Sequence, residues 1–381
     1  MPKGCSIQLE KLAQRYVLDN ISAAIGTKNV LVSAIAGFEE DAGQPLSLEA
    51  FLSFHHLDIR DIYRVAPFSK LCAEAGVTEE FHEDDEDALA KAVPRLCLID
   101  SRRWIRFLLQ VLERADSLVW EELSAEEQRM LDMFQITLWP ESIRRRGGLK
   151  AKPGALEFPD SCGCIRRIAA QPHMANEIRL ILTYRLDHIG IVDQKADWSF
   201  ACPLDLYCQY TRDQIFVALG RYDPQNMRQG VAYLKDHRVD VLLNTLDKSE
   251  KAYSPTTMYE DYSIDALHFH WQSQNKTTPA SVTGRRYQTQ WDVEQDKPSK
   301  VALFVREAKS DRYGGTEPYA FLGFCRCESS EGSRPMSIVW KLDHPIPARF
   351  LRRTARLAGE LSFLQPSAAG LACAQNAQYA A

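Results

Sequence analysis

The sequence predicts an α+β protein, in which an N-terminal helical domain precedes a β domain. Apolar residues recur at helical spacing through residues 1–143. From about residue 226 the apolar period changes to two, in short runs that turn-forming residues separate. Strands without long helices between them favour a mixed or antiparallel sheet, so we expect a barrel-like or sandwich domain that ends in a C-terminal helix.

The composition indicates a soluble globular chain of more than one domain. Of the 381 residues, 45% are hydrophobic and 25% are charged. No apolar run reaches membrane-spanning length, and Met1 is not followed by a basic-then-apolar segment. We therefore expect a cytoplasmic chain with no membrane partner, in which the ten cysteines are reduced.

Charge divides the chain into two parts. Residues 1–143 carry 14 Lys+Arg and 25 Asp+Glu, a net charge of −11, whereas residues 144–381 carry 32 and 26, a net charge of +6. The acidic part is predicted to be a docking or spacer domain. The basic part is where a polyanion is expected to bind.

The N-terminal domain, residues 1–143, is predicted to contain several helices. Residues 1–17 show helical spacing, and a second helix is expected over 46–54 with Ser47 as its N-cap. The strongest amphipathic pattern lies over 100–115. Seven acids within residues 79–87 predict an exposed loop or a fraying helix start.

Residues 144–154 (RRRGGLKAKPG) are predicted to form a basic linker, because three glycines and a proline resist regular structure. Residues 155–225 then read as a small helical subdomain, with helices over 174–186 and 211–219. Residues 362–381 are rich in small residues and are expected to be disordered.

The β domain is expected over residues 226–361, with a final helix over 348–361. Its strands are predicted at 231–234, 239–246, 267–273, 300–308, 318–328 and 336–342.

Residues 244–287 mix aromatic side chains with hydroxyls, amides, two histidines and an arginine pair. Such a mixture suits a surface that stacks on flat rings and hydrogen-bonds their edges. The alternative is an aromatic-rich sheet whose polar residues serve its turns.

Several runs in this region resemble a known family: TLDKSE, YSPTTMYEDYSI, FHWQSQ, TGRRY and, further on, PMSIVWKLDHPIP. They are similar to the uncharacterised C-terminal domain of bacterial proteins that join a phospholipase-D-like nuclease to a superfamily 2 helicase. The segments PKGCSIQLEK and SLEAFLSFHHLDIRDIYR look like the region just after that helicase. The resemblance covers about residues 3–357, and one such protein, from staphylococci, is a type IV restriction enzyme that needs ATP and cuts DNA containing 5-methylcytosine.

The resemblance implies a target-recognition module for modified double-stranded DNA, with 5-methylcytosine as the expected modification, in an ATP-dependent phage-defence system. Its implied partners are helicase and nuclease domains of the same or another chain, and a homodimer is compatible with it. The sequence has no phosphate-cradling G-x-x-x-x-G-K-[ST] motif and no His-x-Lys pair of the phospholipase-D nucleases. We therefore expect no enzymatic activity by those mechanisms, and no cofactor or metal.

Candidate contacts follow from that implied role, because an extruded base is held by stacking and by hydrogen bonds to its edge. The base-recognition candidates are Tyr253, Thr256, Tyr259, Tyr262, His270, Trp271, Gln272 and Ser273. The phosphate-binding candidates in the same region are Lys248, Arg285 and Arg286.

A second phosphate-binding candidate is the predicted C-terminal helix. Its arginines Arg349, Arg352, Arg353 and Arg356 recur at i, i+3, i+4 and i+7, so a helix places them on one stripe. Such a stripe suits phosphate tracking. A solvated face paired with acids of the N-terminal half is the alternative.

Three other functions stay open. Glu307-x-Lys309 after an apolar strand, with Asp292 and Asp296 upstream, outlines a PD-(D/E)xK nuclease that uses Mg²⁺. The Cys162/Cys164 and Cys325/Cys327 pairs offer thiols to zinc, and His268 and His270 share a strand face, although burial explains such pairs more simply. Finally, the chain is compatible with a non-catalytic scaffold that couples a helicase to its partners.

Overall fold

The computed structural model describes residues 27–150, 152–224, 230–246, 261–348 and 350–351. The chain forms two compact units. Of the described residues, the helical unit comprises those up to Ile191 together with Ala201–Pro203 and Asp213–Pro224, and the sheet unit comprises Val192–Phe200, Leu204–Arg212 and those after Pro224. The predicted α+β class, with helices before a sheet, is confirmed.

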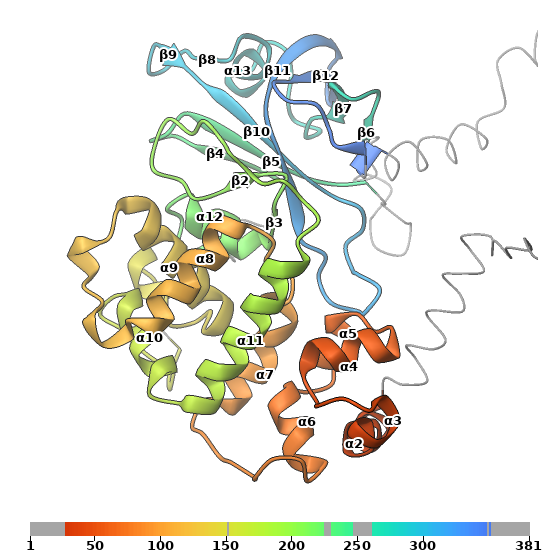
Figure 1. The fold of residues 1–381 in the computed structure, drawn as a ribbon. Coiled ribbons are helices and arrows are strands. Elements are labelled where there is room, and N and C mark those ends of the chain that lie inside the picture. The colour runs from red at the N-terminus through yellow and green to blue at the C-terminus, as the bar shows by residue number, and fades with distance from the viewer. Residues whose placement is uncertain (1–26, 151, 225–229, 247–260, 349, 352–381) are drawn as a thin grey trace, which may run out of the picture. The chain divides into compact units, whose positions relative to one another are not determined.

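The helical unit contains eleven α-helices among its described residues (Figure 1). They are α2 (Lys28–Ala36), α3 (Phe38–Ala42), α4 (Leu48–His55), α5 (Ile59–Tyr63), α6 (Phe68–Glu74), α7 (Glu86–Leu96), α8 (Arg102–Glu113), α9 (Ala125–Leu138), α10 (Ser161–Ala169), α11 (Pro172–His188) and α12 (Arg212–Ala218). Three short 3₁₀ helices complete the unit: η1 (Ala115–Ser117), η2 (Trp120–Glu122) and η3 (Arg144–Gly147).

Local sequence signals set several of these boundaries. The Ser47 hydroxyl accepts a hydrogen bond from the Ala50 amide, so Ser47 caps α4 as predicted. The amphipathic segment predicted over 100–115 forms α8, which buries Trp104 and Leu108 among others. The helical spacing predicted for residues 1–17 lies outside the described part of the chain.

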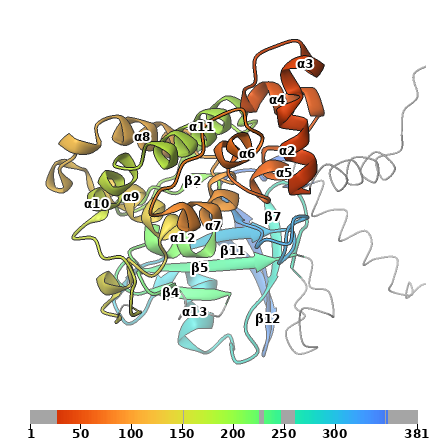
Figure 2. The ribbon, with the colours of Figure 1, turned by 90° about the horizontal axis from the view of Figure 1, so that it is seen from below.

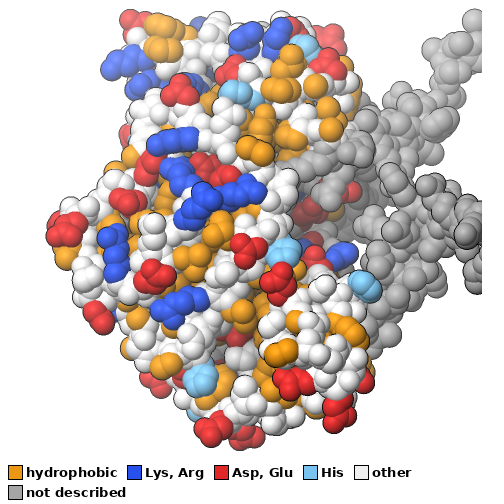
Figure 3. Space-filling view, viewed as in Figure 1, with side chains coloured by type: hydrophobic (Ala, Val, Ile, Leu, Met, Phe, Trp, Pro, Cys, Tyr) orange, Lys and Arg blue, Asp and Glu red, His pale blue; other side chains and the backbone are white. Residues whose placement is uncertain are grey.

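The acidic run 79–87 does more than face solvent. Glu83 accepts hydrogen bonds from the amides of His173 and Met174, at the start of α11. Asp85 is buried, where it forms an ion pair with Arg167 and accepts a hydrogen bond from Gln171. Part of this run therefore fastens the start of α7 to α10 and α11. Other acids of the N-terminal half stay at the surface, where they dot the lower edge in Figure 3.

The structure places the main boundary later than the predicted linker over 144–154. Residues 144–147 form η3, and its Arg146 pairs with the buried carboxylate of Asp132 on α9. Beyond the predicted linker, α10 packs against α8 and α9, and α11 packs against α7 and α8. The helices of 155–188 therefore share one compact unit with the N-terminal helices, because they complete the same apolar core.

The sheet unit is built on a mixed sheet that curls into a half-barrel. Its strand order is β4-β5-β10-β11-β12-β7-β6, and β3 also pairs with β11. The bounds are β3 (Gln209–Tyr210), β4 (Val231–Leu234), β5 (Val239–Thr245), β6 (Tyr262–Ser263), β7 (His268–Gln272), β10 (Lys300–Arg306), β11 (Tyr319–Gly332) and β12 (Met336–Leu342). Outside this sheet, β1 (Gln194–Lys195) pairs with β2 (Asp205–Leu206), and β8 (Trp291–Asp292) pairs with β9 (Lys297–Pro298).

All six predicted strands are confirmed to within a few residues, and the sheet is mixed because β5 and β10 run parallel. The other pairs along the strand order are antiparallel. The chain is helical again at residues 348, 350 and 351, within the predicted final helix, and the other positions of that helix lie outside the described residues. Among the described helices, none combines the length and apolar character that a membrane crossing needs.

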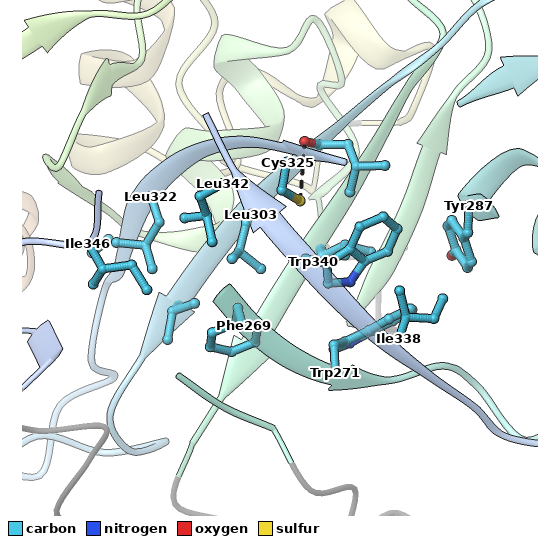
Figure 4. Close-up of a cluster of buried hydrophobic side chains, with 14 of the residues drawn as sticks. Phe269, Trp271, Tyr287, Leu303, Leu322, Cys325, Ile338, Trp340, Leu342 and Ile346 are labelled. Atoms are coloured by element: carbon cyan, nitrogen blue, oxygen red, sulfur yellow. Dashed lines mark hydrogen bonds between the residues drawn. The ribbon is translucent and has the colours of Figure 1, made fainter. Parts of the chain in front are cut away.

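The core of the sheet unit lies between one sheet face and helix α13 (Val282–Thr289), which packs on β11. In the view of Figure 2, α13 lies below β4. The rings of Trp271, Tyr287 and Trp340 meet at this helix, with the Tyr287 ring edge-on to both indoles (Figure 4). Gly284 lets α13 approach closely, because a Cβ there would lie 2.0 Å from the Thr278 carbonyl oxygen. Helix α13 thus fills one end of the curled sheet.

Candidate nucleic-acid interface

Two of the predicted base-recognition residues belong to the core. Trp271 is 3% exposed and packs against Tyr287 and Trp340. Ser273 is fully buried, where its amide donates to the Met336 carbonyl and its hydroxyl accepts from the Met336 amide. Stacking of a base on Trp271 is therefore corrected to core packing, because strand alternation turns this indole to the covered sheet face.

Three other candidates share the opposite face of β7 or the strand beside it. His270 and Gln272 are half-buried, and they alternate with Phe269 and Trp271. Tyr262 on β6 is directly opposite His270, and their rings stack at a centroid distance of 4.8 Å and an angle of 19°. The structure thus brings an imidazole, a phenol ring and an amide together at the edge of the sheet.

His268 shares this outer face, and it has a carboxylate close to each of its ring nitrogens. Nδ1 lies 2.8 Å from Asp265, and Nε2 lies 2.9 Å from Glu328 on β11. The hydrogen bond to Asp265, followed by the charges of Asp265 and Glu328, raises the pKa of His268 against a smaller opposing effect of desolvation. Lys341, 3.5 Å from Glu328, also opposes the increase.

We expect this cluster to make stability depend on pH. A raised folded pKa stabilises the fold fully below the unfolded histidine pKa of about 6.5, and this stabilisation is lost as the pH rises through the folded value. The difference in melting temperature between wild type and His268→Gln should therefore be largest near pH 6 and shrink toward pH 8.5. A difference that grows with pH contradicts this assignment.

The two arginines of α13 have different environments. Arg285 is exposed and available to a phosphate. Arg286 is 6% exposed and donates two hydrogen bonds to Asp240 on β5, at 2.7 and 2.9 Å. Its guanidinium also lies 3.5 Å from the ring centroid of Tyr233, whose hydroxyl donates to Asp292. Arg286 is therefore corrected from a phosphate contact to an anchor of α13.

The remaining candidates for base or phosphate contacts lie outside the residues that the structure describes. They are Lys248, Tyr253, Thr256, Tyr259, Arg349, Arg352, Arg353 and Arg356.

A pocket opens at the end of the curled sheet that α13 leaves unfilled. We call it the mouth pocket, and its empty volume of about 410 Å³ includes open solvent. Its lining residues are Gln209, Leu246, Val305, Arg306, Glu307, Glu317, Pro318, Ala320, Leu322 and Phe350. The apolar members Val305, Ala320 and Leu322 belong to the core of the sheet unit, and Leu246 and Phe350 pack against that core.

The polar members of the mouth pocket are held by the strand ends. Arg306 donates to the Thr245 hydroxyl at 2.9 Å and to the Glu317 carbonyl at 3.3 Å, and its guanidinium lies 4.4 Å from the Tyr319 ring centroid. The Glu317 carboxylate accepts from the Ala308 amide at 3.2 Å. The pocket thus combines an apolar wall with the carboxylates of Glu307 and Glu317 and the amide of Gln209.

Sequence reasoning missed this pocket, apart from Glu307. Ligands of open sheets containing parallel strands commonly bind beyond the carboxyl ends of those strands. Leu246 and Glu307 come directly after the parallel pair β5 and β10. That pairing joins segments far apart in the sequence, as at Val239 and Lys300, so local patterns do not reveal it.

The PD-(D/E)xK alternative is not supported by this geometry. Asp292 and Asp296 precede β10 and Glu307 follows it, so a seven-residue strand of about 20 Å separates them. Asp292 instead accepts hydrogen bonds from Tyr233 and from the amides of Glu294 and Gln295. Among the described residues, no three His, Cys, Asp or Glu side chains gather as a metal site requires.

Burial explains three of the four cysteines in the Cys-x-Cys pairs, whereas Cys327 is partly exposed. Cys162 and Cys164 are buried on α10, and Cys325 is buried on β11, where its thiol lies 3.8 Å from the Val301 carbonyl oxygen. Burial raises the pKa of Cys162 to about 11 and that of Cys164 and Cys325 well above the ordinary value. These three cysteines are therefore neutral thiols near pH 7.

Comparison with known families assigns a domain but no activity. Residues 204–353 match a family model described as a domain of unknown function, DUF3427. The match begins at the start of the Leu204–Arg212 segment and ends just past Leu351, so it covers most of the sheet unit. No curated protein matches the chain. Residues 204–353 are therefore similar to an uncharacterised domain family, and an association with helicases and nucleases stays a proposal.

Proposed function

We propose that the sheet unit is a DNA-binding module that takes an extruded, modified cytosine into the mouth pocket. The observation that carries this proposal is the pairing of carboxylates with an apolar wall at the open end of the half-barrel. Apolar pockets with a few convergent polar groups are the usual sites for small rings, and barrel mouths are common places for them. An extruded base is such a ring.

The chemistry of the pocket matches 5-methylcytosine. The exocyclic N4 amine of cytosine donates hydrogen bonds, and glutamate or aspartate is its usual acceptor. Glu307 supplies that acceptor at the rim, and the Gln209 amide can donate to N3 or O2. The C5 methyl group then faces the wall formed by Val305, Leu322 and Phe350.

These contacts predict an order of affinities. Burial of one methyl group is worth about 0.8 kcal/mol, so 5-methylcytosine should bind about fourfold more tightly than cytosine. Thymine carries the same methyl group but presents O4, an acceptor, where cytosine presents N4–H. In the pocket, O4 of thymine and the Glu307 carboxylate would face each other as two acceptors without a hydrogen between them. These unpaired acceptors cost more binding free energy than a missing methyl group does.

The other parts of the chain complete this proposal. The helical unit, which includes the acidic N-terminal part, docks the helicase and nuclease domains of a modification-dependent restriction system in the cytoplasm. Tyr262, His270 and Gln272 form a second polar surface on β6 and β7 that contacts the duplex outside the pocket. The exposed Arg285 contacts phosphate.

The test is the binding of Glu307→Gln to duplexes that differ at one position. A glutamine can donate to O4 of thymine as well as accept from N4 of cytosine. We therefore expect the variant to lose most of the preference of wild type for 5-methylcytosine over thymine, measured by fluorescence anisotropy. Glu331→Gln, which removes an exposed carboxylate near the far end of β11, should keep the wild-type preference.

A folded Glu307→Gln protein that discriminates as wild type does would exclude Glu307 as the N4 acceptor. Equal binding by wild type of the duplexes that carry 5-methylcytosine, cytosine or thymine at this position would overturn the proposed function itself.

A further inference from the structure

The loop between β10 and β11 rises directly from the rim of the mouth pocket. Glu307 and Glu317 lie at its two ends, and residues 308–316 form a short hairpin closed by a bridge between Ser310 and Thr316. The amide of Glu317 also donates to the Lys309 carbonyl at 3.3 Å. Whatever enters the pocket therefore passes beside this loop.

Asp311 fixes the shape of the loop. Its carboxylate accepts from the amides of Tyr313 and Gly315 at 2.8 and 2.9 Å, and its own amide donates to the Gly315 carbonyl. Gly314 adopts a φ of +78°, a conformation in which glycine is favoured. A loop held in this way presents its side chains in fixed directions, which lowers the entropy cost of binding.

The charged side chains that this loop exposes are basic. Lys309 and Arg312 lie at its surface, whereas the one acid, Asp311, is occupied by backbone amides. The Arg312 guanidinium lies 4.6 Å from the ring centroid of Tyr313 and donates to its hydroxyl. The loop thus offers positive charge beside a rim whose two carboxylates repel a polyanion.

We propose that this loop is a phosphate-binding finger, in which Lys309 and Arg312 contact the DNA backbone beside the base held in the mouth pocket. This inference rests on the proposed function and extends it. Lys309 lies two residues and Arg312 five residues beyond Glu307, so at roughly 3.3 Å per residue they reach at most about 7 and 17 Å from the rim. Since phosphates of one strand advance about 3.4 Å per nucleotide along the helix axis, the contacts fall within about five nucleotides of the extruded base.

The test compares two double variants of the full chain that remove the same charge. Lys309→Ala with Arg312→Ala should weaken methylated and plain duplex by the same factor, because phosphate contacts carry no sequence information. The slope of log affinity against log salt should fall by about 1.8, which is about 0.9 for each lost contact. Lys235→Ala with Lys297→Ala, at the opposite end of the parallel strands, should leave affinity and slope unchanged.

A second measurement locates the contact. Uncharged methylphosphonate linkages placed within about five nucleotides of the 5-methylcytosine should weaken binding by wild type but not by the finger variant. If wild type prefers 5-methylcytosine but the finger variant keeps the wild-type salt slope, the finger is overturned and the proposed function stands. The loop would then be a surface for a protein partner. If wild type shows no preference, the proposed function fails whatever the salt slope of the finger variant.

Discussion

Replacement of Arg286 by methionine should lower the free energy of unfolding by about 3–5 kcal/mol, because it leaves the Asp240 carboxylate buried without its partner. Asp240 is fully buried on β5, and Arg286 is its bidentate donor on α13. Burial raises the pKa of Asp240, and Arg286 opposes that increase. This pair is what fastens α13 over the core of the sheet unit.

Two variants make this prediction specific, with urea unfolding as the measurement. Arg285→Ala changes the exposed neighbour on the same helix and should cost about 0.5 kcal/mol or less. The double variant Asp240→Leu with Arg286→Met removes both charges, so it should be clearly more stable than Arg286→Met alone. If Arg286→Met is as stable as Arg285→Ala, the anchoring role of the pair is wrong.

Replacement of Trp271 by alanine should destabilise the protein by about 3–5 kcal/mol, the usual cost of removing a buried tryptophan. The indole is 3% exposed between Tyr287 and Trp340, and surrounding strands and α13 hold these partners in place, so a cavity remains. Loss of DNA binding by this variant would therefore reflect unfolding and must be read beside a melting curve.

Trp291→Ala is the matched control, because Trp291 is 40% exposed in the same unit. Its indole donates one hydrogen bond to Asp296 at 3.2 Å, so this change should cost no more than about 1 kcal/mol. A folded Trp271→Ala protein of near wild-type stability that had lost only its preference for methylated DNA would restore the stacking role.

The strands could be predicted from the sequence because each is a short run in which apolar residues either alternate with polar ones or follow one another without a break. The run HFHWQ shows that the alternating period correctly predicts a strand and also which side chains share a face. Alternation turns Phe269 and Trp271 to one face and His268, His270 and Gln272 to the other. Grouping Trp271 with His270 as base contacts ignored that the two lie on opposite faces.

Other features could not be predicted because they depend on long-range pairing. The mouth pocket needs the parallel register of β5 with β10, the start of β11 and the short strand β3, which lie far apart in sequence. The partner of Arg286 is 46 residues away, and the partner of Asp85 is 82 residues away. Charge patterns alone assigned these residues to solvent or to phosphate.

The central claim is that the mouth pocket reads the N4 amine and the C5 methyl group of a cytosine. Equilibrium binding of the wild-type chain to three duplexes, identical except for 5-methylcytosine, cytosine or thymine at one position, tests it most directly. The account predicts tightest binding to 5-methylcytosine, about fourfold weaker binding to cytosine, and the weakest binding to thymine. Binding of thymine as tightly as 5-methylcytosine would contradict it.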